Sequence, residues 1–125
     1  MRETIHSDRA PKAVGPYSQA IAAGGLIWAS GQIPLLPATG VMVEGGVGEQ
    51  ARQALCNLRA VLEAAGSGLD RVVKATVYLV DMGDFEEFNV VYAEFFGDAP
   101  PARVCVEVSG LPKGARVEVD AVALS

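Results

Sequence analysis

The sequence predicts an α+β fold in which a single mixed β-sheet carries two helices packed on one face. Three observations predict it: β-branched stretches with alternating polarity, two stretches with helical periodicity, and glycine or proline between them. The expected order is a strand, a hairpin, a helix, a strand, a helix and two terminal strands. At 125 residues the chain is expected to form one domain over 1–125.

The first expected elements are a hairpin and a long helix. Gly24 and Gly25 separate apolar runs at 20–23 and 26–30, and a Gly-Gly loop suits a primed two-residue turn. From 48 to 65 apolar residues recur every three or four positions, and Gly66 follows where a C-cap glycine belongs. The apolar positions of this helix are Ala51, Leu55, Leu58, Leu62 and Ala65.

A buried strand and a second helix should follow. Residues 72–80 are mostly β-branched, which is typical of a strand buried on both faces. Asp84 and Glu87 have the spacing of a capping pair, and Gly97 with the prolines at 100 and 101 should end the helix. Its apolar stripe is aromatic and consists of Phe85, Phe88, Tyr92 and Phe95.

The C-terminal end, 102–123, contains two runs of alternating valines joined through 111–114. Alternation predicts that the valines face the core and that the polar residues between them face the other way. Two helices can cover only one face of the sheet. The uncovered face should therefore bear Arg103, Cys105 and Glu118 and meet water or another subunit. It should also bear Glu107, Arg116 and Asp120, and we assign Trp28, the only tryptophan, to packing.

Composition excludes several classes of partner. The net charge is −5 and no Lys/Arg cluster exists, so nucleic acid is not an expected partner. No signal peptide or long apolar run is visible, which favours a cytoplasmic protein that does not enter a membrane. Cys56 and Cys105 should be free thiols, and with one histidine, His6, no metal site is expected.

An ordered set of motifs resembles the RidA (YjgF-type) reactive intermediate deaminases. It comprises G-P-Y-S-Q-A at 15–20, S-G-Q-I-P at 30–34, N-L-x-A-V-L-E-A-A-G at 57–66, D-F-x-x-x-N-x-x-Y-x-x-F-F at 84–96, P-A-R at 101–103, L-P-K-G at 111–114 and V-E-V-D-A-V-A at 117–123. The resemblance spans about 9–124. It implies a chorismate-mutase-like fold, a homotrimer with clefts between subunits, and hydrolysis of enamines and imines to ketones and ammonia without a cofactor.

The resemblance also implies two catalytic residues. Arg103 matches the arginine that binds the substrate carboxylate, and a guanidinium suits this role because it forks onto a carboxylate through two hydrogen bonds. Glu118 matches the glutamate that holds the attacking water and can accept its proton. Glu107 and Asp120 match no catalytic position and serve as internal controls. Cys105 matches a lining position, and without a base partner it is not expected to act as a nucleophile.

The remaining matches are expected to line the cleft. Tyr17 could donate a hydrogen bond from its phenol, and the backbone groups of Ser30 and Gly31 could hold the carboxylate opposite the arginine. Asn89 and Pro112 match further lining positions. For each of these residues a purely structural role, such as a packed aromatic ring or a loop proline, remains the alternative.

The expected function is deamination of 2-enamine or 2-imine acids, such as 2-aminoacrylate, to 2-oxo acids and ammonia. The first alternative is a non-catalytic module that senses small carboxylates, although such a module has no use for Glu118. The second is RNA cleavage or translation inhibition, which the net acidity of the chain disfavours. The physiological imine and the dehydratase that supplies it are left open.

Overall fold

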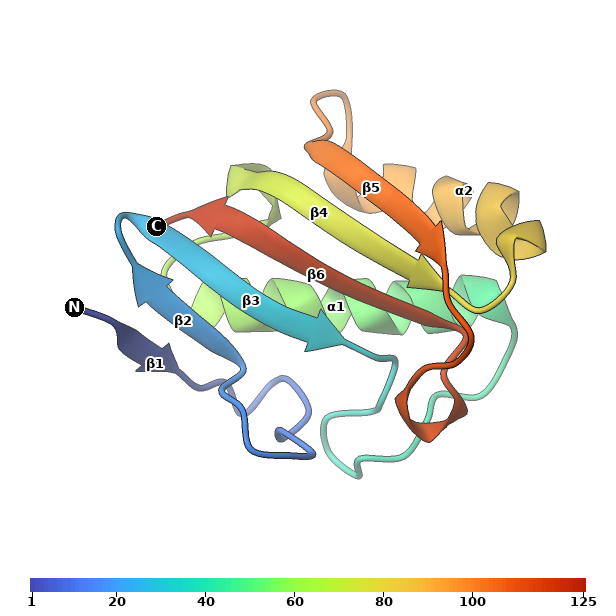
Figure 1. Cartoon of the computed structure of the whole chain (residues 1–125), viewed down its shortest axis with the longest axis horizontal. Coiled ribbons are helices and arrows are strands. Elements are labelled where there is room, and N and C mark those ends of the chain that lie inside the picture. The colour runs from blue at the N-terminus through green and yellow to red at the C-terminus, as the bar shows by residue number, and fades with distance from the viewer.

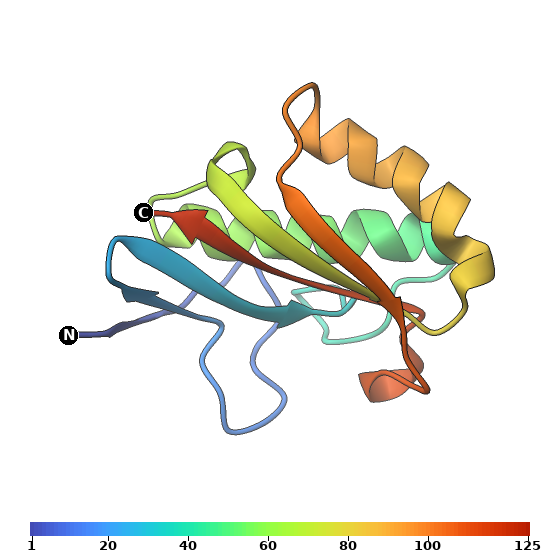
Figure 2. The same ribbon diagram turned by 45° about the horizontal axis from the view of Figure 1, so that its top comes forward.

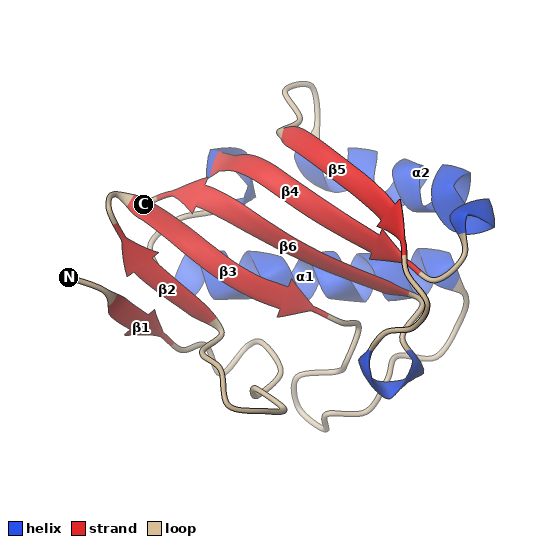
Figure 3. Ribbon diagram, viewed as in Figure 1, coloured by secondary structure: helices blue, strands red, loops and turns tan.

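A computed structural model describes all 125 residues. Its strands form one six-stranded sheet in the order β1-β2-β3-β6-β4-β5, in which only β4 and β5 pair in parallel. Both helices lie against the same face of this sheet (Figures 1 and 3), which confirms the predicted fold class. The elements are β1 (Glu3–Ile5), β2 (Ala20–Ala23), β3 (Leu26–Gln32), α1 (Val47–Ala64), β4 (Val72–Leu79), α2 (Phe85–Phe96), β5 (Ala102–Glu107) and β6 (Val117–Leu124).

Local sequence signals place the turns and the first helix correctly. Gly24 and Gly25 both have positive φ, 62° and 77°, and join β2 to β3 as a two-residue hairpin. Helix α1 ends as expected at Gly66, where the Ser67 N–H donates to the Leu62 carbonyl at 2.9 Å. The Gly66 N–H donates to the Glu63 carbonyl at 3.0 Å, so the last turn has its carbonyls paired.

The main core lies between the sheet and the helices. It is one cluster of 22 buried residues, to which α1 contributes its alanine and leucine stripe. Strand β6 contributes the side of the strand predicted to face the core, namely Val117, Val119, Ala121 and Ala123. No helix of the protein is both long and apolar enough to cross a membrane.

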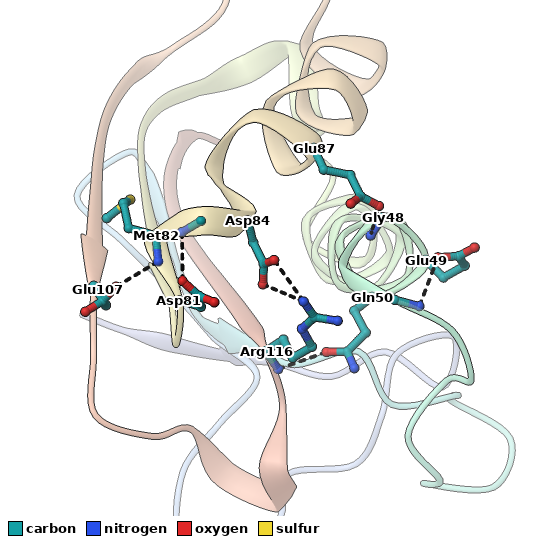
Figure 4. Close-up of polar contacts among 11 residues, drawn as sticks. Gly48, Glu49, Gln50, Asp81, Met82, Asp84, Glu87, Glu107 and Arg116 are labelled. Carbon is teal, nitrogen blue, oxygen red and sulfur yellow. Dashed lines mark hydrogen bonds and ion pairs between the residues drawn. The ribbon is translucent and has the colours of Figure 1, made fainter.

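The predicted capping pair of α2 is wrong. The Asp84 side chain caps nothing and instead accepts two hydrogen bonds from Arg116 Nη2, at 2.8 and 2.9 Å. Glu87 accepts from the Gly48 N–H at the start of α1 (Figure 4). A guanidinium is a stronger partner for a carboxylate than a backbone N–H. Arg116 therefore points toward the helices, where its own N–H donates to Gln50, and not toward the uncovered face.

The face assigned to β5 is also wrong. The parallel pairing sets Arg103 beside Ala75 and Cys105 beside Val77, and both of these β4 residues are buried under the helices. Glu107 pairs with the buried Leu79 in the same way, so Arg103, Cys105 and Glu107 all lie on the helix-covered face, while the valines between them point the other way. Alternation shows which residues share a face, but it does not show which face a helix will cover.

The open face of the sheet is the side on which no helix packs (Figure 2). Glu118 is on this side, paired with Tyr78 across β4 and β6. The assignment of Trp28 to packing is wrong within the chain, because its side chain is 48% exposed here. The strand residues that define the open face are Trp28, Thr76, Tyr78, Val104, Val106, Glu118, Asp120 and Val122.

Candidate functional site

A cavity of about 300 Å³ lies beside Glu118 and gathers most of the residues that the sequence nominated. The loop before β2, the end of β3, and the turn before β6 meet at this place. A volume of this size suits a small organic acid. The lining residues are Val14, Tyr17, Ser30, Gly31, Ile33, Pro112 and Glu118.

A β-bulge shapes the wall of the cavity. Ala29 pairs with Ala121 and Gln32 with Val119, so Ser30 and Gly31 together oppose Asp120 alone. An extra residue in one strand bends it and redirects side chains, which is why bulges often occur beside active sites. The bulge turns the Ser30–Gly31 backbone toward Glu118 on the neighbouring strand.

Ser30 holds the neighbouring loop in place. Its hydroxyl donates to the Ser18 carbonyl at 2.6 Å, and its N–H donates to the Gln19 carbonyl at 2.9 Å. The Ser30 N–H therefore already has a partner, and the expectation that backbone groups of Ser30 and Gly31 hold a carboxylate stays a prediction. The phenol oxygen of Tyr17 accepts from the Val14 N–H at 3.2 Å, which leaves its proton able to reach a ligand.

Two buried amides that the sequence analysis missed support the cavity. Gln19, 4% exposed, accepts from the Ser7 N–H and donates to the Pro11 carbonyl, which ties down the loop that carries Tyr17. Asn57 donates to the Ile33 and Leu35 carbonyls and fixes the chain beyond β3. The available signal was an asparagine within the apolar stripe of a helix, since a buried amide must find partners.

Glu118 has the electrostatic setting of a base. It is half-buried, and no group of the protein donates a hydrogen bond to its carboxylate. Burial, followed by the charge of Asp120, raises the pKa of Glu118 above the ordinary glutamate value. Asp120 accepts from the Tyr78 hydroxyl at 2.9 Å, and burial together with this bond raises the pKa of Tyr78 to about 12. Glu118 is thus free to hold water and take up a proton.

Arg103 lies in a second group of residues, on the helix-covered face. Its Nη1 donates to Asn89 Oδ1 at 2.9 Å, and its guanidinium carbon lies 4.7 Å from the centre of the Tyr92 ring. The centre of the Phe85 ring lies 5.5 Å from the same guanidinium carbon. None of the ion pairs of the chain includes Arg103. Because a guanidinium carries five N–H donors, this uncompensated cation keeps donors for an anion.

Cys105 completes this second group. It is half-buried and packs against the core, and burial raises the pKa of its thiol although Arg103 opposes the shift. The thiol is therefore protonated at neutral pH, which fits a lining role and not a nucleophile. The hydroxyl of Tyr92 is buried without any hydrogen-bond partner, and no sequence pattern had singled it out.

The structure thus divides the nominated residues into two groups. Tyr17, Ser30, Gly31, Pro112 and Glu118 share the cavity. Arg103 lies in the second group, together with Asn89 and Cys105. Arg103 does not line the cavity of its own chain. No group of three His, Cys, Asp or Glu side chains is arranged to hold a metal ion.

Fold and site define an α+β protein with a cavity of about 300 Å³, a half-buried glutamate in it that has no hydrogen-bond partner, and an arginine outside the cavity that has no ion-pair partner. The family model described as endoribonuclease L-PSP matches residues 7–125. A RutC family protein of Pyrococcus horikoshii is 54% identical over 98% of this chain and 98% of its own. The chain therefore belongs to this family, which includes the RutC and RidA proteins.

Two further relatives carry names that bear on activity. A protein of Bos taurus named 2-iminobutanoate/2-iminopropanoate deaminase is 48% identical over 99% of this chain and 90% of its own. The crystal structure of Escherichia coli TdcF with bound serine superposes with a TM-score of 0.94 at 40% identity, covering 98% of each chain. The family and its relatives support imine deamination in general terms, while the family description names an endoribonuclease.

Proposed function

We propose that the protein hydrolyses 2-imino acids, and the 2-enamino acids in equilibrium with them, to 2-oxo acids and ammonia. The observation that carries the proposal is the partnerless Glu118 carboxylate, with its raised pKa, in a cavity sized for a small acid. The deaminase name of the bovine relative and the serine bound to TdcF support a small amino-acid-derived carboxylate as the ligand.

In the proposed reaction Arg103 binds the substrate carboxylate through two N–H donors, while Asn89 and the aromatic rings hold the guanidinium plane. Glu118 orients a water molecule and accepts its proton as the oxygen attacks the imine carbon. The substrate reacts as the protonated imine, so this step gives a neutral carbinolamine and a protonated Glu118. Glu118 then returns its proton to the nitrogen. The C–N bond breaks with loss of ammonia, and the carbinolamine hydroxyl gives its proton to solvent as the carbonyl forms, so one water is consumed for each imine.

We propose further that the site is completed between subunits of a homotrimer. Arg103 and Glu118 lie on opposite faces of the sheet in one chain, so a ligand in the cavity needs the arginine of a neighbouring copy. The open face supports association, because Trp28, Val104 and Val106 are 48%, 43% and 38% exposed on it. A ring of equivalent contacts would then place one site at each interface.

The function is tested by a coupled assay in which a dehydratase acts on threonine or serine and the decay of the released imine is timed. Wild-type protein should accelerate the decay, and Arg103→Ala and Glu118→Gln should accelerate it far less. Glu107→Gln is the matched control, because Glu107 accepts only from the Met82 N–H, which lies between β4 and α2, and does not line the cavity. Carboxylate binding without acceleration would leave a non-catalytic binding module instead.

Ribonuclease activity is a second candidate because of the name of the family model. The net charge of −5 gives no broad cationic surface for a phosphate backbone. Incubation with single-stranded RNA at low and high salt tests it directly. If wild-type protein cleaves RNA and Glu118→Gln does not, the ribonuclease activity belongs to the same cavity. If imine turnover is also absent, ribonuclease activity replaces the deaminase proposal.

The shared site is tested by mixing two inactive variants. An Arg103→Ala subunit keeps Glu118, and a Glu118→Gln subunit keeps Arg103. When equal amounts are unfolded and refolded together, about a quarter of the interfaces in a random ring should regain both groups. Recovery of about a quarter of wild-type turnover supports a site shared between chains. No recovery in verified mixed oligomers would mean that the two residues do not act together across an interface.

A further inference from the structure

We propose that Gly31 is a positioning residue whose missing side chain leaves the space in which the Glu118 carboxylate lies. A Cβ atom built on Gly31 would lie 2.7 Å from Glu118 Cδ and 3.0 Å from its Cγ, and closer still to Oε2. Non-bonded carbon atoms do not approach within 3 Å of each other. An alanine at position 31 would therefore overlap the Glu118 side chain in its present position. The inference rests on the catalytic role proposed for Glu118.

The backbone does not explain why this residue is a glycine. Gly31 is not among the glycines with positive φ, unlike Gly24 and Gly25 in the hairpin, so an L-residue fits its conformation. Space is the remaining constraint. A glycine within a strand commonly marks a bulge or a close approach of another group, and both occur here.

No protein group fixes the Glu118 carboxylate directly. It accepts no hydrogen bond from the chain, and its nearest charged neighbour, Asp120, repels it. The other titratable groups beside it are Tyr78 on β4, which is bonded to Asp120, and Tyr17 on the cavity wall. The position of the carboxylate therefore depends on the shape of the space around it, and Gly31 forms one wall of that space.

An alanine at 31 should displace Glu118 without unfolding the chain. Strand β3 is held on both sides by its pairing with β2 and β6, so its backbone resists movement. The Glu118 side chain is half-exposed and can rotate at little cost. Displacement would take the carboxylate out of its half-buried position and away from the water that it orients.

The experiment compares Gly31→Ala with Gly110→Ala, a matched glycine whose added Cβ would meet no atom within 4 Å and whose φ is not positive. Circular dichroism should show both variants folded. In Gly31→Ala kcat for imine hydrolysis should fall on the order of a hundredfold, as for loss of a general base, with KM changed less than threefold. Gly110→Ala should retain wild-type kcat.

Two further readouts separate positioning from general disturbance. The double variant Gly31→Ala with Glu118→Gln should be no slower than Glu118→Gln alone, because both changes remove the same function. Carbon-13 NMR titration of the Glu118 carboxyl should show its pKa falling toward the ordinary glutamate value in Gly31→Ala. The inference would be overturned if the double variant had a kcat reduced by the product of the two single effects. It would also be overturned if the pKa of the Glu118 carboxyl were unchanged in Gly31→Ala.

The NMR titration also keeps this inference distinct from the proposed function. Absence of imine turnover in the wild-type protein would remove the deaminase proposal. The comparison of the Glu118 pKa between wild type and Gly31→Ala would still decide whether the glycine determines where the carboxylate lies.

Discussion

Replacing Arg103 with lysine distinguishes a positive charge from an oriented guanidinium. The guanidinium donates to Asn89 at 2.9 Å and lies over the Tyr92 ring at 4.7 Å, which fixes its plane and leaves parallel donors for a carboxylate. A lysine ammonium keeps the charge but cannot bond Asn89 and fork onto a ligand in one plane. Loss of one hydrogen bond to a charged group costs about 1.5–3 kcal/mol, and weaker ring stacking adds about 0.5–1 kcal/mol.

These terms predict a loss of about 2–4 kcal/mol of transition-state binding, or about a 30- to 900-fold lower kcat/KM in Arg103→Lys. Arg103→Ala should be only somewhat worse. The assay is imine hydrolysis with circular dichroism as the folding check. Arg52→Lys is the matched control, because Arg52 also lies over a ring, that of Phe95, but already pairs with Glu94. Turnover in Arg103→Lys within threefold of wild type would refute the oriented fork.

Three further outcomes follow from burial. Glu118→Gln should raise the free energy of unfolding at pH 7 but not near pH 3. The raised pKa of Glu118 disfavours the folded state only once the pH exceeds the pKa of the unfolded glutamate. Thermal melts between pH 3 and pH 7 check the sign. Tyr92→Phe should stabilise the chain by about 1 kcal/mol in urea unfolding and keep turnover, since it removes a buried hydroxyl without a partner. Val104→Asp should lower the oligomer mass in light scattering, whereas Val90→Asp, on the outer surface of α2, should not.

Elements encoded by local signals could be predicted from the sequence. Helix α1 begins and ends within one residue of its predicted bounds, because its periodicity and Gly66 act within a few residues of one another. The β2–β3 hairpin is equally local, since its two glycines alone permit the turn. The cap of α2 was not predictable in this way, because Arg116, which binds Asp84, comes 32 residues later in the chain.

The candidate site was predictable as a set of residues but not as a geometry. Motif resemblance nominated Tyr17, Gly31 and Glu118, and the structure brings them to one cavity. The reason for a glycine at 31 lies in a neighbouring strand and could not be derived from a single sequence. The support that Gln19 gives to the cavity was likewise invisible, since its partners are backbone groups of the N-terminal segment.

The misassigned face of β5 has the largest functional consequence. The helix-covered side of this edge strand meets Asn89 and the aromatic rings of α2, which suit a guanidinium better than a valine because they offer an oxygen acceptor and π-faces. The β5 valines consequently add to the exposed apolar surface of the open face, where β4 separates them from the strand that carries Glu118. The same alternation that places Arg103 away from the cavity of its own chain puts these valines on the open face, and the proposed site shared between chains would make turnover depend on assembly.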